Sequence, residues 1–508
     1  MIRLAAPLVL FLILAPTQAA SVEVGQIVYE RWCAGCHGEK GDGNGPAARY
    51  LMPKPRDFTL GMFKYKSTAG ESPPSDEDLD RIVAEGMAGT SMPGWKDVLN
   101  DTERRDVVAF IKKFSDIFEF EKPGQRIPLA GQLAGSPKAI ELGREVYRKA
   151  KCAECHGDAG RGNISKKLKD DWGDAIWPRN LTKPWTFRGG SDVKDVYTRL
   201  TVGIPGTPMP VFGDPGKKES LSEEERWAAA HYVLSLADYA RRPSPGATTI
   251  RAVYRPGELV AEPLAEAWAE APAVSFRLAP QIIAADRLFT SVVDQVTARA
   301  VYNDKEIALL VEWDDPTPSR PGDRAQANLA PGEMFEDAVA VQFPAEQGDK
   351  LEKPYFGHGD AANPVVVWHW SAGRADGRAA YSIFDMRGTG TRVTRDPVGS
   401  GFSARGQYVN GTWRVVFRQA RNHGEGQIAF ETARLLPVAF ATWDGSNGDR
   451  GSKHTLTRWV WLWLAPPPTL KVVYVPAIVM ALLAGGLLTV STRMRRSGRR
   501  LREEEDEK

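Results

Sequence analysis

Two short segments of this 508-residue sequence each place two cysteines and a histidine at the same spacing. The first segment holds Cys33, Cys36 and His37, and the second holds Cys152, Cys155 and His156. Two thiols at this spacing form thioethers with the vinyl groups of a porphyrin, and the adjacent imidazole then reaches the iron. Zinc sites and redox dithiols also pair cysteines, but neither requires a histidine directly after the second one. The segments use all four cysteines and predict two covalently attached c-type haems.

An iron held by one imidazole leaves an opposite axial position, which methionine or histidine usually fills. The string G-x-x-G-T-x-M-P occurs twice, at residues 86–93 and 203–210. Its methionines are Met92 and Met209, at matching places downstream of the two histidines. Packing in a core is the simpler role for a methionine, but the shared string favours axial ligation of the haem iron by both residues.

The elements around these motifs also repeat. Each copy ends in an amphipathic stretch with helical spacing, at 102–114 and at 222–236. Such duplication indicates two copies of one domain. We place them at residues 21–122 and 138–242, joined by a linker rich in glycine and proline.

These two regions resemble the small monohaem cytochrome c family. In that family a loop methionine followed by proline completes the coordination of iron. The resemblance implies that both domains are all-α. It also implies that Gly25 and Gly143 let the first and last helices of each domain cross closely.

Beyond residue 246 the sequence changes to short runs of β-branched and aromatic residues separated by Gly, Asn and Asp. The candidate strands are 296–302, 306–313, 338–343, 365–370, 412–418, 427–435 and 456–464. This pattern predicts an antiparallel β-sandwich over residues 247–465.

Four strings in this region, at 335–344, 354–360, 364–370 and 438–445, resemble the γ subunits of the ethylbenzene dehydrogenase family. The resemblance implies a β-sandwich that binds one non-covalent haem b. Members of that family serve as electron-transfer subunits beside molybdenum enzymes and their iron–sulfur partners.

The axial ligands of haem b in that family are a methionine and a lysine, and this sequence departs from the pattern. His358 stands where the family has methionine, and Lys453 and His454 stand near the expected lysine. We expect His358 and His454 to be the pair, with Lys453 as the alternative to His454. A sandwich without haem remains a further alternative. His369 ranks lower because it alternates with tryptophans that should face the core, and His423 has no evident partner.

The two ends of the chain carry targeting signals. Residues 1–20 have the charge, apolar run and small residues of a signal peptide, with an uncleaved anchor as the alternative. Residues 472–490 are uncharged and span roughly 28 Å as a helix, enough for a bilayer. The arginine-rich tail, 491–508, should stay in the cytoplasm, which places the domains on the periplasmic side.

The chain has 66 basic and 64 acidic residues, so it lacks the excess of positive charge that is typical of nucleic-acid-binding proteins. We found no catalytic triad or phosphate-binding loop. The sequence therefore predicts an electron-transfer subunit rather than a catalytic one. The resemblance to the ethylbenzene dehydrogenase γ subunits implies as partners a molybdopterin oxidoreductase of the nitrate/nitrite, dimethylsulfide or chlorate/selenate type and iron–sulfur subunits. We also expect a periplasmic carrier or terminal acceptor. The alternatives are a haem enzyme with an open iron site, and a dihaem cytochrome with a haem-free docking or ligand-binding module.

Overall fold

The computed structural model describes most of the chain. The described residues are 19–163, 166–346, 352–397, 399, 401–421, 428–467 and 471–506. Almost all of the predicted signal peptide, residues 1–20, lies outside them, as do His423 and the first residue of the strand expected at 427–435.

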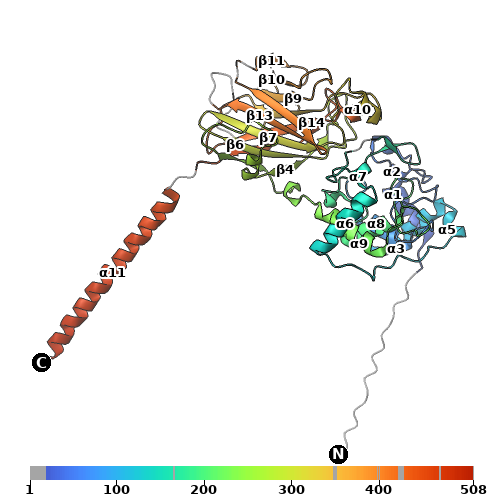
Figure 1. Ribbon diagram of the computed structural model, residues 1–508, viewed down its shortest axis with the longest axis horizontal. Helices are drawn as coiled ribbons and strands as arrows, with labels where there is room; N and C mark the ends of the chain where they lie inside the picture. Colours follow the sequence, from blue (N-terminus) through green and yellow to red (C-terminus); the bar gives the residue numbers. More distant parts are fainter. Residues whose placement is uncertain are drawn as a thin grey trace, which may run out of the picture.

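The N-terminal half consists of two helical units with the same order of elements (Figure 1). The first contains α1 (Val22–Trp32), α2 (Ala34–His37), α3 (Asp76–Glu85), α4 (Asp101–Ile111) and α5 (Ile117–Phe120). The second contains α6 (Pro137–Lys149), α7 (Ala153–His156), α8 (Val193–Val202) and α9 (Glu223–Ser235). A small antiparallel hairpin of β1 (Leu168–Lys169) and β2 (Ala175–Ile176), which the all-α expectation did not include, also belongs to the second unit.

The first and last helices of each unit cross at a glycine. A Cβ atom on Gly25 of α1 would lie 2.0 Å from the backbone oxygen of Asp106 in α4. A Cβ atom on Gly143 of α6 would lie 2.1 Å from the backbone oxygen of Ala228 in α9. Any side chain would therefore push the two helices apart, which confirms the expected close crossings.

The C-terminal half is a β-sandwich whose strands are hydrogen-bonded into one path. Its order is β11-β10-β9-β8-β14-β16-β3-β6-β7-β13-β12, and β4, β5 and β15 pair at its sides. The bounds are β3 Thr249–Tyr254, β4 Val274–Arg277, β5 Ala279–Pro280, β6 Gln295–Tyr302, β7 Glu306–Asp314, β8 Ala338–Pro344, β9 Val365–Ser371, β10 Ala380–Met386, β11 Val393–Arg395, β12 Ser403–Val409, β13 Thr412–Ala420, β14 Leu435–Trp443, β15 Thr455–Leu456 and β16 Val460–Leu464. The short helix α10 (Arg324–Leu329) lies between β7 and β8.

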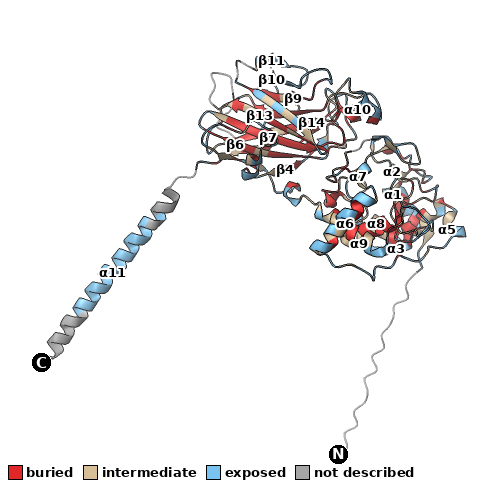
Figure 2. Cartoon of the chain, viewed as in Figure 1, coloured by how far each residue is buried: buried red, intermediate tan, exposed pale blue. Residues whose placement is uncertain are grey.

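Strand β14 links the two layers. Its residues 435–438 pair with β16 and its residues 439–443 pair with β8. Most pairs are antiparallel as expected, but β3 lies parallel to both β16 and β6. The layers meet in a core of aliphatic and aromatic side chains, where the rings of Trp313 and Trp370 lie 6.4 Å apart. Figure 2 shows this interior as the largest buried region of the chain.

Two of the expected strands differ from the structure. Residues 428–434 form no strand, and the ladder begins only at Leu435. The run at 456–464 is split into β15 and β16, because its register against β14 shifts by one residue between the pair Leu456–Ala441 and the pair Val460–Val438.

Helix α11 (Lys471–Asp506) extends away from the sandwich (Figure 1). Within it, Ile478–Ser497 is long and apolar enough to cross a membrane, judged by length and composition, and none of this stretch is buried. Its apolar residues face solvent along the helix (Figure 2).

The three folded units contact one another. Between the helical units, Lys64 pairs with Asp170 at 3.3 Å and Arg81 with Asp195 at 2.8 Å. Between the second helical unit and the sandwich, three cations surround one carboxylate, Asp314 at the end of β7. They are Arg161, Lys183 and Arg241, at 3.2, 3.1 and 3.0 Å.

Candidate haem sites

Each Cys-x-x-Cys-His segment forms a single helical turn, α2 or α7, which directly follows the first helix of its unit. A buried tyrosine of that first helix anchors the turn. Tyr29 donates its hydroxyl to the oxygen of Gly38, and Tyr147 donates to the oxygen of Gly157, both at 2.7 Å. The two segments therefore have the same local geometry, as their sequence identity predicts.

The two histidines of these segments are fixed in the same way. Nδ1 of His37 lies 3.0 Å from the backbone oxygen of Arg56, and Nδ1 of His156 lies 2.9 Å from that of Arg179. A carbonyl accepts only from a protonated nitrogen, so Nδ1 carries the hydrogen and Nε2 keeps its lone pair. Burial lowers the pKa of both imidazoles, which favours the neutral form that binds metal. This orientation by a carbonyl partner is typical of metal-ligating histidines.

The cysteines of the two segments are all free thiols, half-buried at the ends of these turns. Burial, with a smaller effect of Cys36, raises the pKa of Cys33 to about 12. Burial likewise raises the pKa of Cys152 to about 11. A redox dithiol needs a lowered thiol pKa, and the pKa values of Cys33 and Cys152 are raised instead.

The two methionine loops are also alike. The backbone N–H of Met92 donates to Oγ1 of Thr90 at 3.1 Å, and that of Met209 donates to Oγ1 of Thr207 at 3.3 Å. Both methionines are half-buried, and Met209 packs against the same core as Cys152. The shared turn therefore presents both thioethers in the same manner.

A cluster of cations lies where the two helical units meet. Arg56 stacks over the ring of Trp172 from the other unit, and burial and Arg188 lower the pKa of Arg179 to about 10. Among the described residues, no carboxylate forms an ion pair with Arg56, Arg179 or Arg188, and Nε of Arg188 is buried without a partner. The three guanidinium groups are half-buried, and Asp170 and Asp294 act on Arg56 and Arg179 only from beyond ion-pair distance. The carboxylate side chains of a porphyrin would supply counter-charges, so the residues present fit haem c.

The sandwich contains a cavity of about 490 Å³ on the outer face of the layer formed by β8, β9, β10 and β14. Alternate residues of these strands point into it, and several are small. The floor consists of Ala338, Ala340, Gln342, Val367, His369, Phe384, Met386, Ala439, Ala441 and Trp443. The alanines leave room above the sheet that larger side chains would fill. A concave, largely apolar cavity of this size is typical of a cofactor site.

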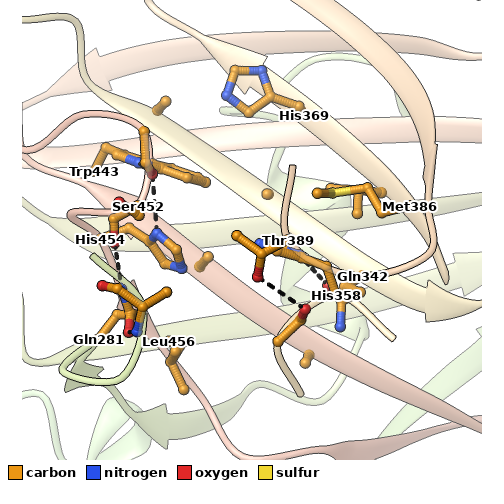
Figure 3. Close-up of a pocket in the computed structure, with 18 of the residues that line it drawn as sticks. Gln281, Gln342, His358, His369, Met386, Thr389, Trp443, Ser452, His454 and Leu456 are labelled. Carbon is orange, nitrogen blue, oxygen red and sulfur yellow. Dashed lines mark hydrogen bonds between the residues drawn. The ribbon is translucent and has the colours of Figure 1, made fainter. Parts of the chain in front are cut away.

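Two histidines enter this cavity from loops that are distant in the sequence. The rings of His358 and His454 lie 6.2 Å apart between centroids (Figure 3). Nδ1 of His358 lies 2.8 Å from Oε1 of Gln342, and Nδ1 of His454 lies 3.1 Å from the oxygen of Gly451. Both contacts occupy Nδ1 and leave Nε2 for a metal. Burial lowers the pKa of both imidazoles, that of His454 to about 4, so both are neutral at pH 7.

The backbone at His358 supports a functional role. Its φ of +70° lies in the left-handed region, which a residue other than glycine rarely adopts. Such strain persists where the surrounding structure fixes it, and it concentrates at functional sites. Together with the free Nε2 atoms and the apolar walls, it makes the cavity fit a haem held by two imidazoles.

The other candidate ligands differ in their access to the cavity. Lys453 does not line the cavity among the described residues, although it neighbours His454. His369 does line it, because Trp368 and Trp370 point into the core and turn His369 to the opposite face. Met386 also lines the cavity (Figure 3). His231, on α9, instead contacts the backbone oxygen of Leu133 through Nε2 at 2.8 Å.

Sequence reasoning missed Gln342, which orients His358 from the floor of the cavity. The alternation of Ala338, Ala340 and Gln342 along one strand was a visible signal. It marks a face with small side chains and one polar group, which is unusual for a strand buried on both sides.

Comparisons with known proteins match the parts of the chain separately. Residues 20–111 match the family of cytochrome c oxidase, cbb3-type, subunit III, and residues 140–237 match cytochrome c. Residues 265–395 match ethylbenzene dehydrogenase.

Two relatives have names that concern respiratory reductases. A protein of Haloferax mediterranei designated a respiratory nitrate reductase haem subunit is 26% identical over 255 residues, which cover 49% of this chain and 86% of the relative. The chlorate reductase subunit gamma of Ideonella dechloratans is 29% identical over 214 residues, which cover 42% of this chain and 82% of the relative.

Among solved structures, the Kuenenia stuttgartiensis reducing HAO-like protein complex Kustc0457/Kustc0458 has a similar chain. It is 40% identical with a TM-score of 0.41, and the match covers 43% of this chain and 97% of that one. The family matches are consistent with the order of the candidate sites along the sequence. The chain therefore joins cytochrome c domains to a domain of the ethylbenzene dehydrogenase family.

Proposed function

We propose that this protein is a membrane-anchored, periplasmic electron-transfer subunit that holds two haem c groups and one haem b. The observation that carries the proposal is the pair of neutral imidazoles, His358 and His454, that share one apolar cavity. It adds a third redox site to the two Cys-x-x-Cys-His segments. The haems, when bound, supply the one-electron chemistry, and the protein supplies ligands, burial and orientation.

Each c-type site takes its ligands from one helical unit. In the first, which we place at residues 21–122, Cys33 and Cys36 attach the porphyrin and His37 and Met92 ligate the iron. In the second, at 138–242, Cys152 and Cys155 attach it and His156 and Met209 ligate. Thioether ligation raises a haem's reduction potential relative to two imidazoles. The b-type site, with His358 and His454, should therefore have the lowest potential of the three.

Contacts between the units support transfer among the three sites. The carbonyls that orient His37 and His156 belong to Arg56 and Arg179, and the side chains of both arginines reach the boundary between the helical units. The ring of Tyr50, in the first unit, lies 4.6 Å from that of Phe289. Phe289 belongs to the loop whose residues Gln281 and Ile283 line the cavity of the sandwich. Rigid contacts of this kind hold the sites at fixed separations.

The names of two relatives support a choice of partner. Their names place them in nitrate and chlorate reductases, and the ethylbenzene dehydrogenase family works beside molybdenum enzymes with iron–sulfur subunits. We infer that this chain connects such an oxidoreductase to a periplasmic carrier or acceptor. Ile478–Ser497 supplies the anchor, and the arginines from Arg493 onward, at its end and beyond it, keep the C-terminus in the cytoplasm.

Carbon monoxide tests electron transfer against catalysis at an open iron. Purified full-length protein is reduced with dithionite and exposed to the gas. Because each proposed iron has two protein ligands, we expect the reduced spectrum to stay unchanged and a redox titration to give three one-electron steps. A haem that binds carbon monoxide stoichiometrically would contradict the proposal and support a haem enzyme.

A further inference from the structure

Three buried carboxylates meet at the ends of three strands of the sandwich. Asp315 follows β7, Asp337 precedes β8 and Asp444 follows β14. One oxygen of each lies within 4.8 Å of the other two. The three residues are at most 1% exposed.

No positive charge among the described residues compensates this cluster. No Lys, Arg or His there forms an ion pair with any of the three carboxylates. Asp314, the neighbour of Asp315 in the sequence, differs in this respect, because it forms ion pairs with three cations. Burying three carboxylates without a counter-charge is strongly unfavourable.

The cluster also has oxygen atoms that accept nothing. Oδ2 of Asp315 and Oδ2 of Asp444 are buried and have no hydrogen-bond partner. Buried acceptors normally have a partner, so each exception requires an explanation.

The remaining oxygens are held by donors from the protein. Asp337 accepts from the backbone N–H of Ser319 at 2.6 Å, from that of Gly445 at 2.8 Å and from Nε1 of Trp413 at 2.9 Å. Oδ1 of Asp444 accepts from the backbone N–H of Ser446 at 3.0 Å. These bonds fix the carboxylates in place, so the free oxygens are oriented before any ligand arrives.

We propose that Asp315, Asp337 and Asp444 bind one Ca²⁺ ion. Carboxylate oxygens are the ligands of hard divalent cations, and Ca²⁺ accepts them at about 2.3–2.6 Å. Oxygens on opposite sides of such an ion are about 4.6–5.2 Å apart, which suits a cluster of this spread. Mg²⁺ needs shorter bonds and a near-ideal octahedron, so it fits less well.

The ion would join the ends of β7, β8 and β14. Phe335 and Glu336, just before Asp337, line the haem cavity, as do Asp449 and Gly451 in the loop after Asp444. Gly451 in turn accepts from His454. The cation would therefore stabilise the rim of that cavity, but its binding requires no haem.

Terbium luminescence tests this proposal on the purified full-length protein. Tb³⁺ replaces Ca²⁺ and emits when a nearby tryptophan is excited, and Trp413 contacts Asp337 directly. We expect saturable emission at one ion per chain that Ca²⁺ abolishes by competition. Asp444→Asn should lower the affinity for both Tb³⁺ and Ca²⁺ at least about tenfold, because affinity for these ions increases with the charge of the ligands. Asp376→Asn, at an exposed position, should leave binding unchanged.

Two results would overturn the proposal: no saturable binding of either ion, or equal affinity in wild type and Asp444→Asn. If Asp444→Asn does not fold, the melting temperature of the wild type tests the proposal instead. Addition of EGTA should then lower its melting temperature and Ca²⁺ should restore it. A melting temperature that neither EGTA nor added Ca²⁺ changes, in protein shown by metal analysis to contain no calcium, would refute the site while leaving the haem assignment intact.

Discussion

The imidazole of His358 lies 6.2 Å from that of His454, between ring centroids, across the cavity of the sandwich. The two residues come from loops on different sides of β9, β10 and β14, so only the folded sheet brings them together. Gln342 and Gly451 hold their Nδ1 atoms. The arrangement predicts a bis-histidine site.

Substitution of either histidine should remove only haem b. In His358→Ala and His454→Ala the remaining imidazole cannot hold the haem alone, so the b-type haemochrome band should disappear while the c-type band keeps its wild-type intensity. His231→Ala, whose imidazole contacts Leu133, is the control and should keep both bands. Survival of the b-type band in both cavity variants would contradict the ligand assignment.

His369 should make the stability of the sandwich depend on pH. Burial and, to a smaller degree, Arg392 lower the pKa of its imidazole to about 4, against 6.5 when unfolded. Between these pH values the imidazole of His369 is protonated in the unfolded chain but neutral in the folded chain. The free energy of unfolding therefore falls as the pH drops from 6.5 towards 4. Between pH 7 and pH 4 the free energy of unfolding should therefore fall less in His369→Phe than in the wild type, by up to about 3 kcal/mol. Denaturant unfolding at several pH values measures this, and equal losses in both proteins would disprove it.

Gly143→Ala should destabilise the second helical unit. The Cβ atom of the new alanine would overlap the backbone of Ala228. Such overpacking typically lowers the free energy of unfolding by about 1–3 kcal/mol. We expect a lower melting temperature and less attached haem c. Gly246→Ala is the matched control, since nothing lies within 4 Å of its Cβ. Wild-type melting of Gly143→Ala would show that the helices do not cross as described.

Asp314→Asn should loosen the second helical unit from the sandwich. The substitution leaves Arg241 buried without its ion-pair partner, which costs about 3–5 kcal/mol, whereas Lys183 keeps Asp294 at 2.8 Å. Limited proteolysis should then cut near residues 241–246, where the wild type resists, and Asp376→Asn should behave as wild type. Equal resistance of Asp314→Asn would mean that other contacts hold the units together.

Much of this architecture follows from local sequence signals. The Cys-x-x-Cys-His segments, the repeated methionine loops and the crossing glycines are short motifs whose geometry depends on nearby residues. Runs of β-branched and aromatic residues predicted most central strands, such as β7 and β9, because these strands are long and buried on both faces. This composition signal was less reliable elsewhere. It failed at residues 428–434, where apolar residues reach the core without joining a ladder.

The cavity could not be predicted from the strand pattern of the sequence alone. The position of His369 was readable from its tryptophan neighbours, but its access to a cavity depends on the alanines of β8 and β14. The cluster of Asp315, Asp337 and Asp444 was not predicted either, because its members are far apart in the sequence and each follows or precedes a strand as turn residues commonly do. Long-range sheet pairing decides both sites.

The pyridine haemochrome spectrum of the purified full-length protein tests the central claim most directly. It separates c-type from b-type haem and counts each per chain. The account predicts two haem c and one haem b. Two haem c without haem b would contradict the role assigned to the sandwich cavity, and fewer than two would contradict the assignment of the paired cysteines.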